Sequence, residues 1–259
     1  MRRIVLKVGS AVLTENGAIA LKRLQNLVEL ISLLQKKYEV ILVSSGAVAA
    51  GYSLLKLDKK IVSNKQALAA LGQPLLLHTY RDEFAKYNIL CSQILLEASI
   101  FYDKKRLSHA KDAMEVMMKH KIVPIINEND VTATDELVFG DNDQLSAYIT
   151  HHFNADILVI LTDIDGFYDK NPHHFDDAKL QKYVHTIDNN QLKEKHSANS
   201  EFATGGIVTK LKAADFLINN KKNMFLTSGF DLDCVKEFLL ENKHNNGTLF
   251  IGKDNKWLN

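Results

Sequence analysis

One polar stretch of the sequence holds the densest group of side chains that could take part in chemistry. The apolar segment 122–126 predicts a buried strand, and the polar run 127–130 (Asn-Glu-Asn-Asp) follows it directly. A second polar run, 140–143 (Gly-Asp-Asn-Asp), leads into a segment with the pattern of a helix. Amides and carboxylates at the carboxyl end of a buried strand are the site geometry of an open α/β sheet. The same residues could instead form a solvated loop with Asx turns and a helix N-cap at Asn142 or Asp143.

Two lysines differ from the other basic residues in their sequence context. Lys7 lies within an apolar strand, where a charge is not expected unless the side chain reaches water past the strand end. Lys210 lies one turn into a predicted helix that Gly205 and Gly206 open. Its neighbour Lys212 leaves open the alternative that Lys210 is an ordinary exposed helix residue. If both Lys7 and Lys210 are buried, they could face an anionic ligand.

Glycines occupy several of the points where a predicted strand ends or a helix begins. Without a Cβ the backbone can approach a ligand closely, and N–H groups at a helix N-terminus favour phosphate. We therefore consider Gly9, Gly46, Gly205 and Gly206 candidates for an anion site. The sequence has no Walker A motif and no G-x-G-x-x-G motif, so neither a P-loop enzyme nor a standard dinucleotide-binding unit is supported.

Other kinds of site lack part of their pattern. Asp141 and Asp143 begin like a calcium loop, but its sixth and twelfth positions would be Ser146 and His152 rather than glycine and glutamate. The two His-His pairs have no partners at the spacing of zinc ligands. No G-x-S-x-G turn is present for a serine hydrolase.

The composition is that of an ordinary globular protein. The chain has 259 residues, of which 46% are hydrophobic and 24% charged, and its net charge is +1. No block of like charge points to nucleic acid, and neither a signal peptide nor an apolar run of roughly 18 residues for a membrane span is evident. Two cysteines, Cys91 and Cys234, favour free thiols in a reducing cytoplasm. We expect one domain over residues 1–259, near the upper limit for a single core.

The elements that must position these side chains alternate between strands and helices. Strands are predicted at 3–8, 40–43, 89–96, 122–126, 157–161, 224–226 and 248–251, and helices at 21–37, 47–55, 64–87, 108–119, 142–152, 208–219 and 232–240. This order predicts an α/β fold with a mostly parallel sheet covered on both faces. Four strands end in polar or glycine-rich turns, and the carboxyl ends of parallel strands share one edge. We therefore expect the four turns to face a single ligand site.

The polar turns and the segments around them also resemble those of a known family. The matching segments are LKVGSAVLT (6–14), VSSGAVAAG (43–51), INENDVTAT (126–134), GDNDQLSA (140–147), LTDIDGFYDKNP (161–172), ATGGIVTKLKAA (203–214) and GTLF (247–250). Together they resemble the glutamate 5-kinases, which belong to the larger amino acid kinase family. INEND followed by GDND is specific to the glutamate 5-kinases, whereas the glycines at the strand ends would also fit carbamate, acetylglutamate, aspartate or uridylate kinases.

The resemblance implies a three-layer αβα sandwich and the reaction of ATP with L-glutamate to ADP and L-glutamyl 5-phosphate, the first step of proline synthesis. Mg²⁺ is the implied metal, bound to the nucleotide, and no protein ligand for it is assigned. The implied residues are Lys7, Lys210 and Asp143 for catalysis, Lys7, Gly9, Ser10, Thr162, Asp163, Thr204, Gly205, Gly206 and Lys210 for ATP, and Ser45, Gly46, Asn127, Asp130 and Asn142 for glutamate. Asp143 is implied to orient the two lysines.

The resemblance also sets expectations about partners. Many members carry a C-terminal PUA domain, and the sequence ends at Asn259 before one could begin, so we expect a form without it. L-glutamate and ATP are the expected ligands, proline an expected feedback inhibitor, and a homo-oligomer the expected assembly in the cytoplasm. Neither nucleic acid nor a membrane is expected as a partner.

The chemistry of such a reaction agrees with the residues present. A carboxylate is already ionised at pH 7, so its attack on phosphorus needs no general base. The protein must hold two anions together and offset the charge on the phosphoryl group, which two lysines can do. Two alternatives remain: a kinase of the same fold for another acid, such as N-acetylglutamate, aspartate or carbamate, and a non-catalytic ligand-sensing module. The latter predicts loss of a lysine or of Asp143, yet all three are present.

Overall fold

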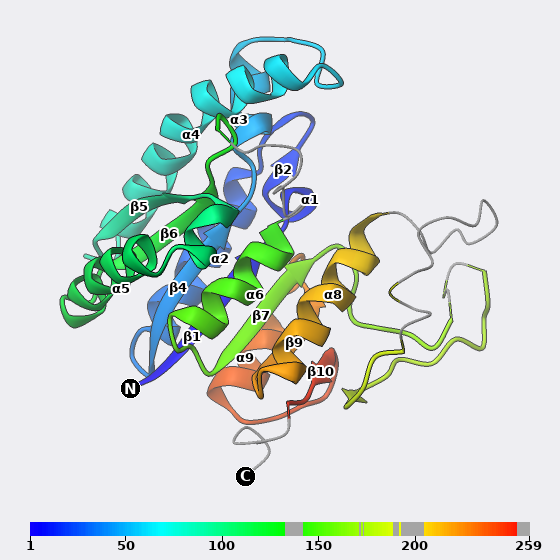
Figure 1. Ribbon diagram of the computed structural model, residues 1–259. Coiled ribbons are helices and arrows are strands. Elements are labelled where there is room, and N and C mark those ends of the chain that lie inside the picture. Colours follow the sequence, from blue (N-terminus) through cyan, green and yellow to red (C-terminus); the bar gives the residue numbers. More distant parts are fainter. Residues whose placement is uncertain (133–141, 171, 173, 189–191, 193–204, 253–259) are drawn as a thin grey trace.

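A central sheet of eight strands organises the chain (Figure 1). The computed structural model describes residues 1–132, 142–170, 172, 174–188, 192 and 205–252. The sheet is formed by β5 (Cys91–Leu96), β6 (Val123–Glu128), β4 (Tyr38–Ser44), β1 (Arg2–Val8), β7 (Ile157–Thr162), β9 (Asn223–Ser228), β10 (Thr248–Phe250) and β8 (Tyr183–Val184), in that spatial order. All neighbouring pairs run parallel except β9 with β10. The predicted α/β class with a mostly parallel sheet is therefore confirmed.

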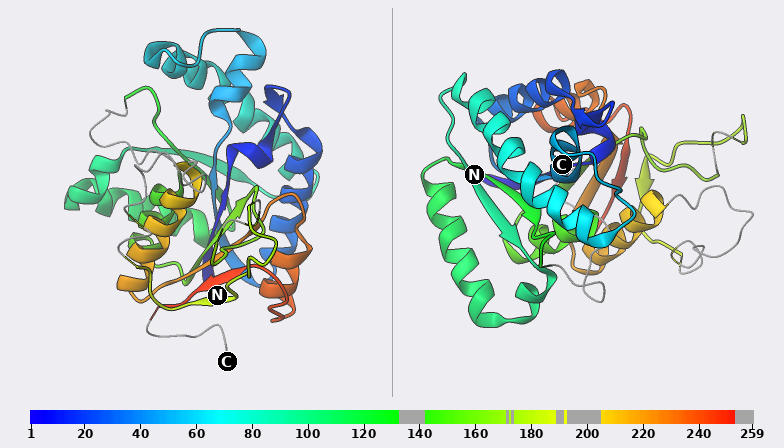
Figure 2. Two further views of the ribbon diagram at one scale, coloured as in Figure 1. Left: turned by 90° about the vertical axis from the view of Figure 1, so that its right-hand side faces the viewer. Right: turned by 90° about the horizontal axis from the view of Figure 1, so that it is seen from above.

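Helices cover both faces of this sheet and form the outer layers of a three-layer sandwich (Figure 2). The helices are α1 (Ser10–Leu13), α2 (Leu21–Leu34), α3 (Ala47–Leu54), α4 (Val62–Ala85), α5 (Lys104–Lys119), α6 (Asn142–His152), α8 (Gly205–Asn219) and α9 (Asp233–Leu240), with a 3₁₀ turn at Ala98–Tyr102. Side chains of α2, α4 and α9 pack in one apolar core, and those of α5, α6 and α8 in a second core. The two groups of helices lie on opposite faces of the sheet. Within the described residues, no helix is long and apolar enough to cross a membrane.

The pleat of β1 decides which layer each of its side chains enters. Ile4, Leu6 and Val8 belong to the core under α2, whereas Val5 belongs to the core under α6 and α8. Successive side chains of a strand point to opposite faces, so Lys7 shares the face of Val5. Lys7, the penultimate residue of β1, is thus directed toward α6 and α8.

The strand ends lie at one edge of the sheet, as predicted. Val8 is in register with Ser44 on one side and with Leu161 on the other. The next residue, Gly9, donates its main-chain N–H to the Leu161 carbonyl at 3.0 Å, and the N–H of Ser45 lies 3.3 Å from the Val8 carbonyl. Main-chain hydrogen bonds therefore join the turn after β1 to the end of β7, and the turn after β4 to the end of β1.

Helices α3 and α4 pack unusually closely beside this edge. A Cβ on Gly51 would lie 1.9 Å from the Leu68 carbonyl oxygen, and one on Gly72 would lie 1.9 Å from the Ala47 carbonyl oxygen. Only glycine permits such an approach of two backbones. Because α3 starts immediately after the turn that ends β4, the contact at Gly72 fixes α4 against that turn.

Candidate active site

Two lysines and one aspartate form a buried group of charges between β1, α6 and α8. Lys7 is 1% exposed, Lys210 5% and Asp143 fully buried. The Lys7 ammonium forms an ion pair with Oδ1 of Asp143, and the Lys210 ammonium lies 3.1 Å from Oδ2. Each carboxylate oxygen thus contacts one lysine. We call these three residues the charged triad.

Local structure explains how each member of the triad reaches its place. Asp143 lies in the first turn of α6, where the partial positive charge of the helix N-terminus stabilises a carboxylate. Lys210 lies in the second turn of α8 and also donates to the Gly206 carbonyl oxygen at 3.0 Å. The Thr209 hydroxyl, 3.0 Å from Oδ2 of Asp143, adds a second contact between α6 and α8. The alternatives of an exposed Lys210 and of a Lys7 that reaches bulk water are both wrong.

The net charge of the triad favours an anionic ligand. Two ammonium groups and one carboxylate sum to one positive charge, and a buried positive charge is stabilised by an anion. A Cβ on Gly9 would lie 3.8 Å from the Lys7 nitrogen, and a Cβ on Gly206 would lie 3.8 Å from the Lys210 nitrogen. Glycine at these two positions therefore leaves room for a ligand beside each ammonium group.

The candidate glycines do not all act in the way the sequence predicted. The N–H of Gly9 is already bonded to the Leu161 carbonyl, so the backbone of Gly9 contributes space rather than a donor. Gly46 has φ +112° and caps the N-terminus of α3, a conformation that residues with a side chain rarely adopt. Gly205 and Gly206 open α8, as expected.

A second polar group, made of amides and hydroxyls, joins β4, β6, α4 and α6. The Asn142 side-chain nitrogen donates to Oδ1 of Asn127 at 2.8 Å and to the Ser45 hydroxyl oxygen at 3.0 Å. Asn127, only 4% exposed, donates in turn to Oε1 of Gln73 at 2.9 Å. Three residues predicted from the sequence are thereby brought together. Gln73 was not predicted to belong to any site.

Asp130 lies in the turn after β6, next to the start of α4. Gln66 in α4 donates to the Val131 carbonyl at 3.2 Å, which holds this turn against the helix. Burial raises the pKa of the Asp130 carboxyl above its usual range, and the positive charge of Lys65 opposes this rise without cancelling it. The nearby Lys65 was not predicted from the sequence to belong to any site.

Residues predicted to contact ATP follow the ends of the neighbouring strands β1 and β7. Ser10 is exposed at the start of α1, and Thr162 is buried at the end of β7. The Thr162 hydroxyl donates to the exposed carboxylate of Asp163 at 2.8 Å. Thr204 lies outside the described residues.

Comparison with known proteins agrees with this arrangement. The family model described as "Amino acid kinase family" matches residues 2–228. The chain belongs to the amino acid kinase family. Its relatives include proteins named glutamate 5-kinase from Leishmania donovani (52% identity, 98% of this chain and 96% of that protein), Wolinella succinogenes (52%, 97% and 98%) and Oceanobacillus iheyensis (42%, 98% and 69%).

Solved structures show the same fold at much lower sequence identity. A UMP kinase from Ureaplasma parvum superposes with a TM-score of 0.64 at 17% identity, over 96% of this chain and 97% of that one. An isopentenyl phosphate kinase substrate complex gives 0.65 at 16%, over 96% and 99%. The three-layer αβα sandwich of an amino acid kinase is thus confirmed.

A magnesium ion would be bound to this amino acid kinase mainly through the nucleotide. Within the described residues, no three acidic, histidine or cysteine side chains are grouped so that they could hold a metal ion. The carboxylate of Asp143 already contacts two lysines. Mg²⁺ keeps several of its waters and commonly binds through substrate phosphates with few protein ligands, so these residues fit a metal that arrives with ATP.

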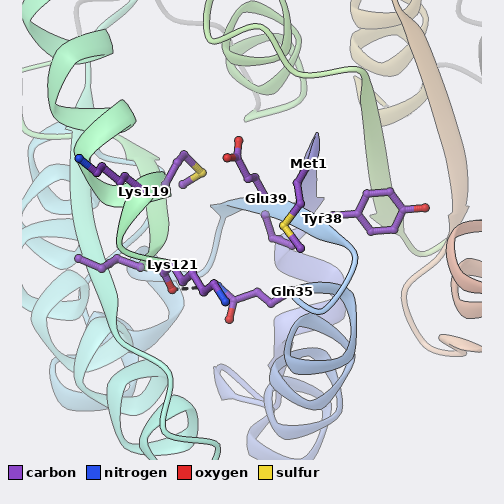
Figure 3. A pocket seen from close by; sticks show the side chains of 9 residues that line it. Met1, Gln35, Tyr38, Glu39, Lys119 and Lys121 are labelled. Carbon is purple, nitrogen blue, oxygen red and sulfur yellow. Dashed lines mark hydrogen bonds between the residues drawn. The ribbon is translucent and has the colours of Figure 1, made fainter.

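One cavity of this amino acid kinase lies at the opposite edge of the sheet (Figure 3). It measures about 230 Å³ and is lined by Met1, Gln35, Tyr38, Glu39, Val40, Met118, Lys119, Lys121 and Ile122. These residues lie at or near the amino-terminal ends of β1, β4 and β6. Gln35 donates to the Lys121 carbonyl at 3.2 Å across one side of it. Because ligands of parallel sheets bind at the carboxyl ends of the strands, this cavity is separate from the candidate active site.

Proposed function

We propose that this chain transfers the γ-phosphoryl group of ATP to the side-chain carboxylate of L-glutamate and forms L-glutamyl 5-phosphate, the first step of proline biosynthesis. The observation that carries the proposal is identity of 50–52% to three proteins named glutamate 5-kinase, over 97–98% of this chain. The buried charged triad supports it, because two lysines held by one carboxylate suit phosphoryl transfer.

The proposed reaction is a direct displacement. An oxygen of the glutamate γ-carboxylate attacks the γ-phosphorus, the bond from that phosphorus to the β–γ bridging oxygen breaks, and ADP leaves with the electron pair. Lys7 and Lys210 offset the negative charge of the migrating phosphoryl group, while Asp143 holds both lysines in place. No proton has to be moved, because the attacking carboxylate is ionised at neutral pH.

We propose the same division of ligands that the sequence predicted. Gly9, Ser10, Thr162, Asp163, Thr204, Gly205, Gly206, Lys7 and Lys210 contact ATP, and Ser45, Gly46, Asn127, Asp130 and Asn142 contact glutamate. The network of Ser45, Asn127 and Asn142 supports the second set, since it supplies neutral donors and acceptors close to the end of β1. Asp130 supports it because a partly desolvated carboxylate gains from an ammonium partner.

A substrate panel tests the proposal. The purified chain is incubated with MgATP, hydroxylamine and one acid at a time, and acyl phosphate is trapped as the coloured hydroxamate. We expect turnover with L-glutamate to exceed that with N-acetylglutamate, aspartate or carbamate. Equal or faster turnover with any of these acids would refute the assignment to free glutamate.

We also propose that proline, the end product of the pathway, competes with glutamate for its subsite, because the two share an α-amino acid head. Initial rates at several proline concentrations should show inhibition that saturating glutamate abolishes. Inhibition that does not depend on glutamate concentration would instead place proline at a separate site.

We propose a homo-oligomer as the functional assembly. Sedimentation as a single species with the mass of one chain would contradict this proposal.

A further inference from the structure

One main-chain group determines the orientation of every amide in the polar network beside the charged triad. The N–H of Glu128 lies 3.0 Å from one side-chain atom of Asn127. A main-chain N–H can only donate, so the Asn127 atom that it meets must be the oxygen. The other side-chain atom of Asn127 is then the nitrogen, which donates.

The orientation of Asn127 fixes the orientation of its two neighbours. Its nitrogen lies 2.9 Å from Gln73, which must therefore present its oxygen. Its oxygen lies 2.8 Å from Asn142, which must present its nitrogen. The same nitrogen of Asn142 lies 3.0 Å from the Ser45 hydroxyl oxygen. Each amide can adopt only one of its two flipped states without placing donor against donor or acceptor against acceptor.

The direction of the Ser45 proton follows from this chain of contacts. Because the Ser45 oxygen accepts from Asn142, its single O–H proton points elsewhere. Within the part of the chain that the structure describes, this proton has no acceptor. The Ser45 hydroxyl is therefore set to donate, and a carboxylate oxygen is the acceptor that it suits best.

Gln73 is the last member of this network and lies in α4, a helix in which no site residue was predicted. It lies in the middle of α4, is 8% exposed and is followed by Pro74. The close contact of Gly72 with Ala47 holds this part of α4 against the turn after β4. A buried polar side chain in a helix is costly unless it is hydrogen-bonded, and Asn127 supplies that bond.

We propose that Gln73 is a positioning residue that, together with the main-chain N–H of Glu128, holds Asn127 and Asn142 in one amide orientation, and so directs the Ser45 hydroxyl proton toward the carboxylate of the substrate. Gln73 acts through two intervening amides and need not touch the substrate. Without its oxygen, the buried N–H group of Asn127 is unpaired, and only the N–H of Glu128 still holds Asn127, which can then turn away from Asn142. Ser45 then loses the contact that orients its proton. The inference rests on the proposed function for the identity of the substrate.

A double-mutant cycle tests the inference. Gln73→Met keeps the length of the side chain and removes the acceptor. We expect the KM for glutamate to rise roughly tenfold, the usual weight of one buried hydrogen bond, while kcat and the KM for ATP change less than about twofold. In the Ser45→Ala background, Gln73→Met should change the KM for glutamate by less than about twofold, because its target is gone. Gln25→Met is the matched control: it removes an amide of α2 that donates to Glu83 on α4, and it should leave all constants unchanged.

Each outcome of the cycle decides one question. If the rise in the KM for glutamate in the double variant equals the product of the rises in the two single variants, Gln73 has a merely structural role. Equal rises in the KM for glutamate and the KM for ATP in Gln73→Met would show the same. Gln73→Leu carries the same expectation and serves if the methionine variant does not fold. If the wild-type chain phosphorylates no glutamate, the proposed function fails. If it does and Gln73→Met is normal, only the present inference fails.

Discussion

Replacing Lys7 or Lys210 with methionine should lower kcat about 10²- to 10³-fold, the usual effect of removing one preorganised charge from a transition state. Both side chains are almost fully buried, and each contacts one oxygen of Asp143. Methionine fills a similar volume without charge, so the change isolates the electrostatic contribution. The lysines stabilise the negative charge of the phosphoryl group most strongly in the transition state, when the group is between the two oxygens. For this reason kcat should fall by a larger factor than the KM for glutamate rises.

Lys212 provides the matched control for this prediction. It lies two residues after Lys210 in the same helix, but its side chain is exposed. Lys212→Met should leave kcat within about twofold of the wild-type value, because an exposed charge is screened by water and salt. Steady-state rates at saturating ATP and glutamate, together with a thermal unfolding scan of each variant, measure both effects. A folded Lys7 or Lys210 variant with normal kcat would remove that lysine from the mechanism.

Asp130→Asn should raise the KM for glutamate about 30- to several-thousand-fold and leave the KM for ATP nearly unchanged. The asparagine keeps the shape and removes the charge. Loss of one member of a buried charge pair typically costs roughly 2–5 kcal/mol. The proposed pair is the Asp130 carboxylate with the α-ammonium of glutamate. The variant should also discriminate less against N-acetylglutamate, which has no ammonium to lose.

The raised pKa of Asp130 predicts the direction of two further effects, one on stability and one on the pH dependence of kcat/KM. A carboxyl whose pKa is raised on folding destabilises the folded protein at pH values above that pKa, and the penalty disappears as the pH falls below the ordinary carboxyl range. Asp130→Asn should therefore leave the stability at pH 7 unchanged or increase it. In the wild-type protein, kcat/KM for glutamate should fall as acid protonates Asp130, and this limb should be missing in the variant.

Two further variants distinguish a binding role for Asp130 from a structural one. Asp112→Asn, on the exposed side of α5, is the matched control and should change neither KM. Lys65→Met removes the cation that lowers the Asp130 pKa, so the acid limb should move to higher pH. Equal rises in both KM values for Asp130→Asn, or a lower melting temperature, would identify Asp130 as a turn residue only.

The strand pattern was sufficient to predict seven of the eight strands of the sheet, all but β8, and the edge at which the candidate residues gather. Apolar segments that end in polar turns predicted strands whose carboxyl ends share one edge, and the register of β1 with β4 and β7 confirms this. Lys7 could be recognised because a lysine in an apolar strand is rare. Lys210 could not be separated from Lys212 by pattern, since the packing of α8 on α6 decides which of them is buried.

Residues that depend on contacts between distant segments were missed. Gln73 stands beside Pro74 in a motif typical of a helix kink, and only the close approach of α3 and α4 turns it into a partner of Asn127. Lys65 was missed for the same reason. The short hairpin of β2 (Thr14–Glu15) and β3 (Ala18–Ile19) was not predicted either. Its turn, Asn16-Gly17, is a strong hairpin signal that is present in the sequence itself.

The central claim, direct attack of a glutamate carboxylate on the γ-phosphorus, can be tested by following one oxygen atom. The chain is incubated with MgATP and L-glutamate labelled with ¹⁸O in the γ-carboxylate, and the inorganic phosphate released when the acyl phosphate cyclises is examined by ³¹P NMR. The labelled oxygen becomes the bridge between carbon and phosphorus and leaves with the phosphate, so we expect phosphate that carries a single ¹⁸O. Phosphate without label would mean that water, and not glutamate, attacked ATP, and would contradict the mechanism.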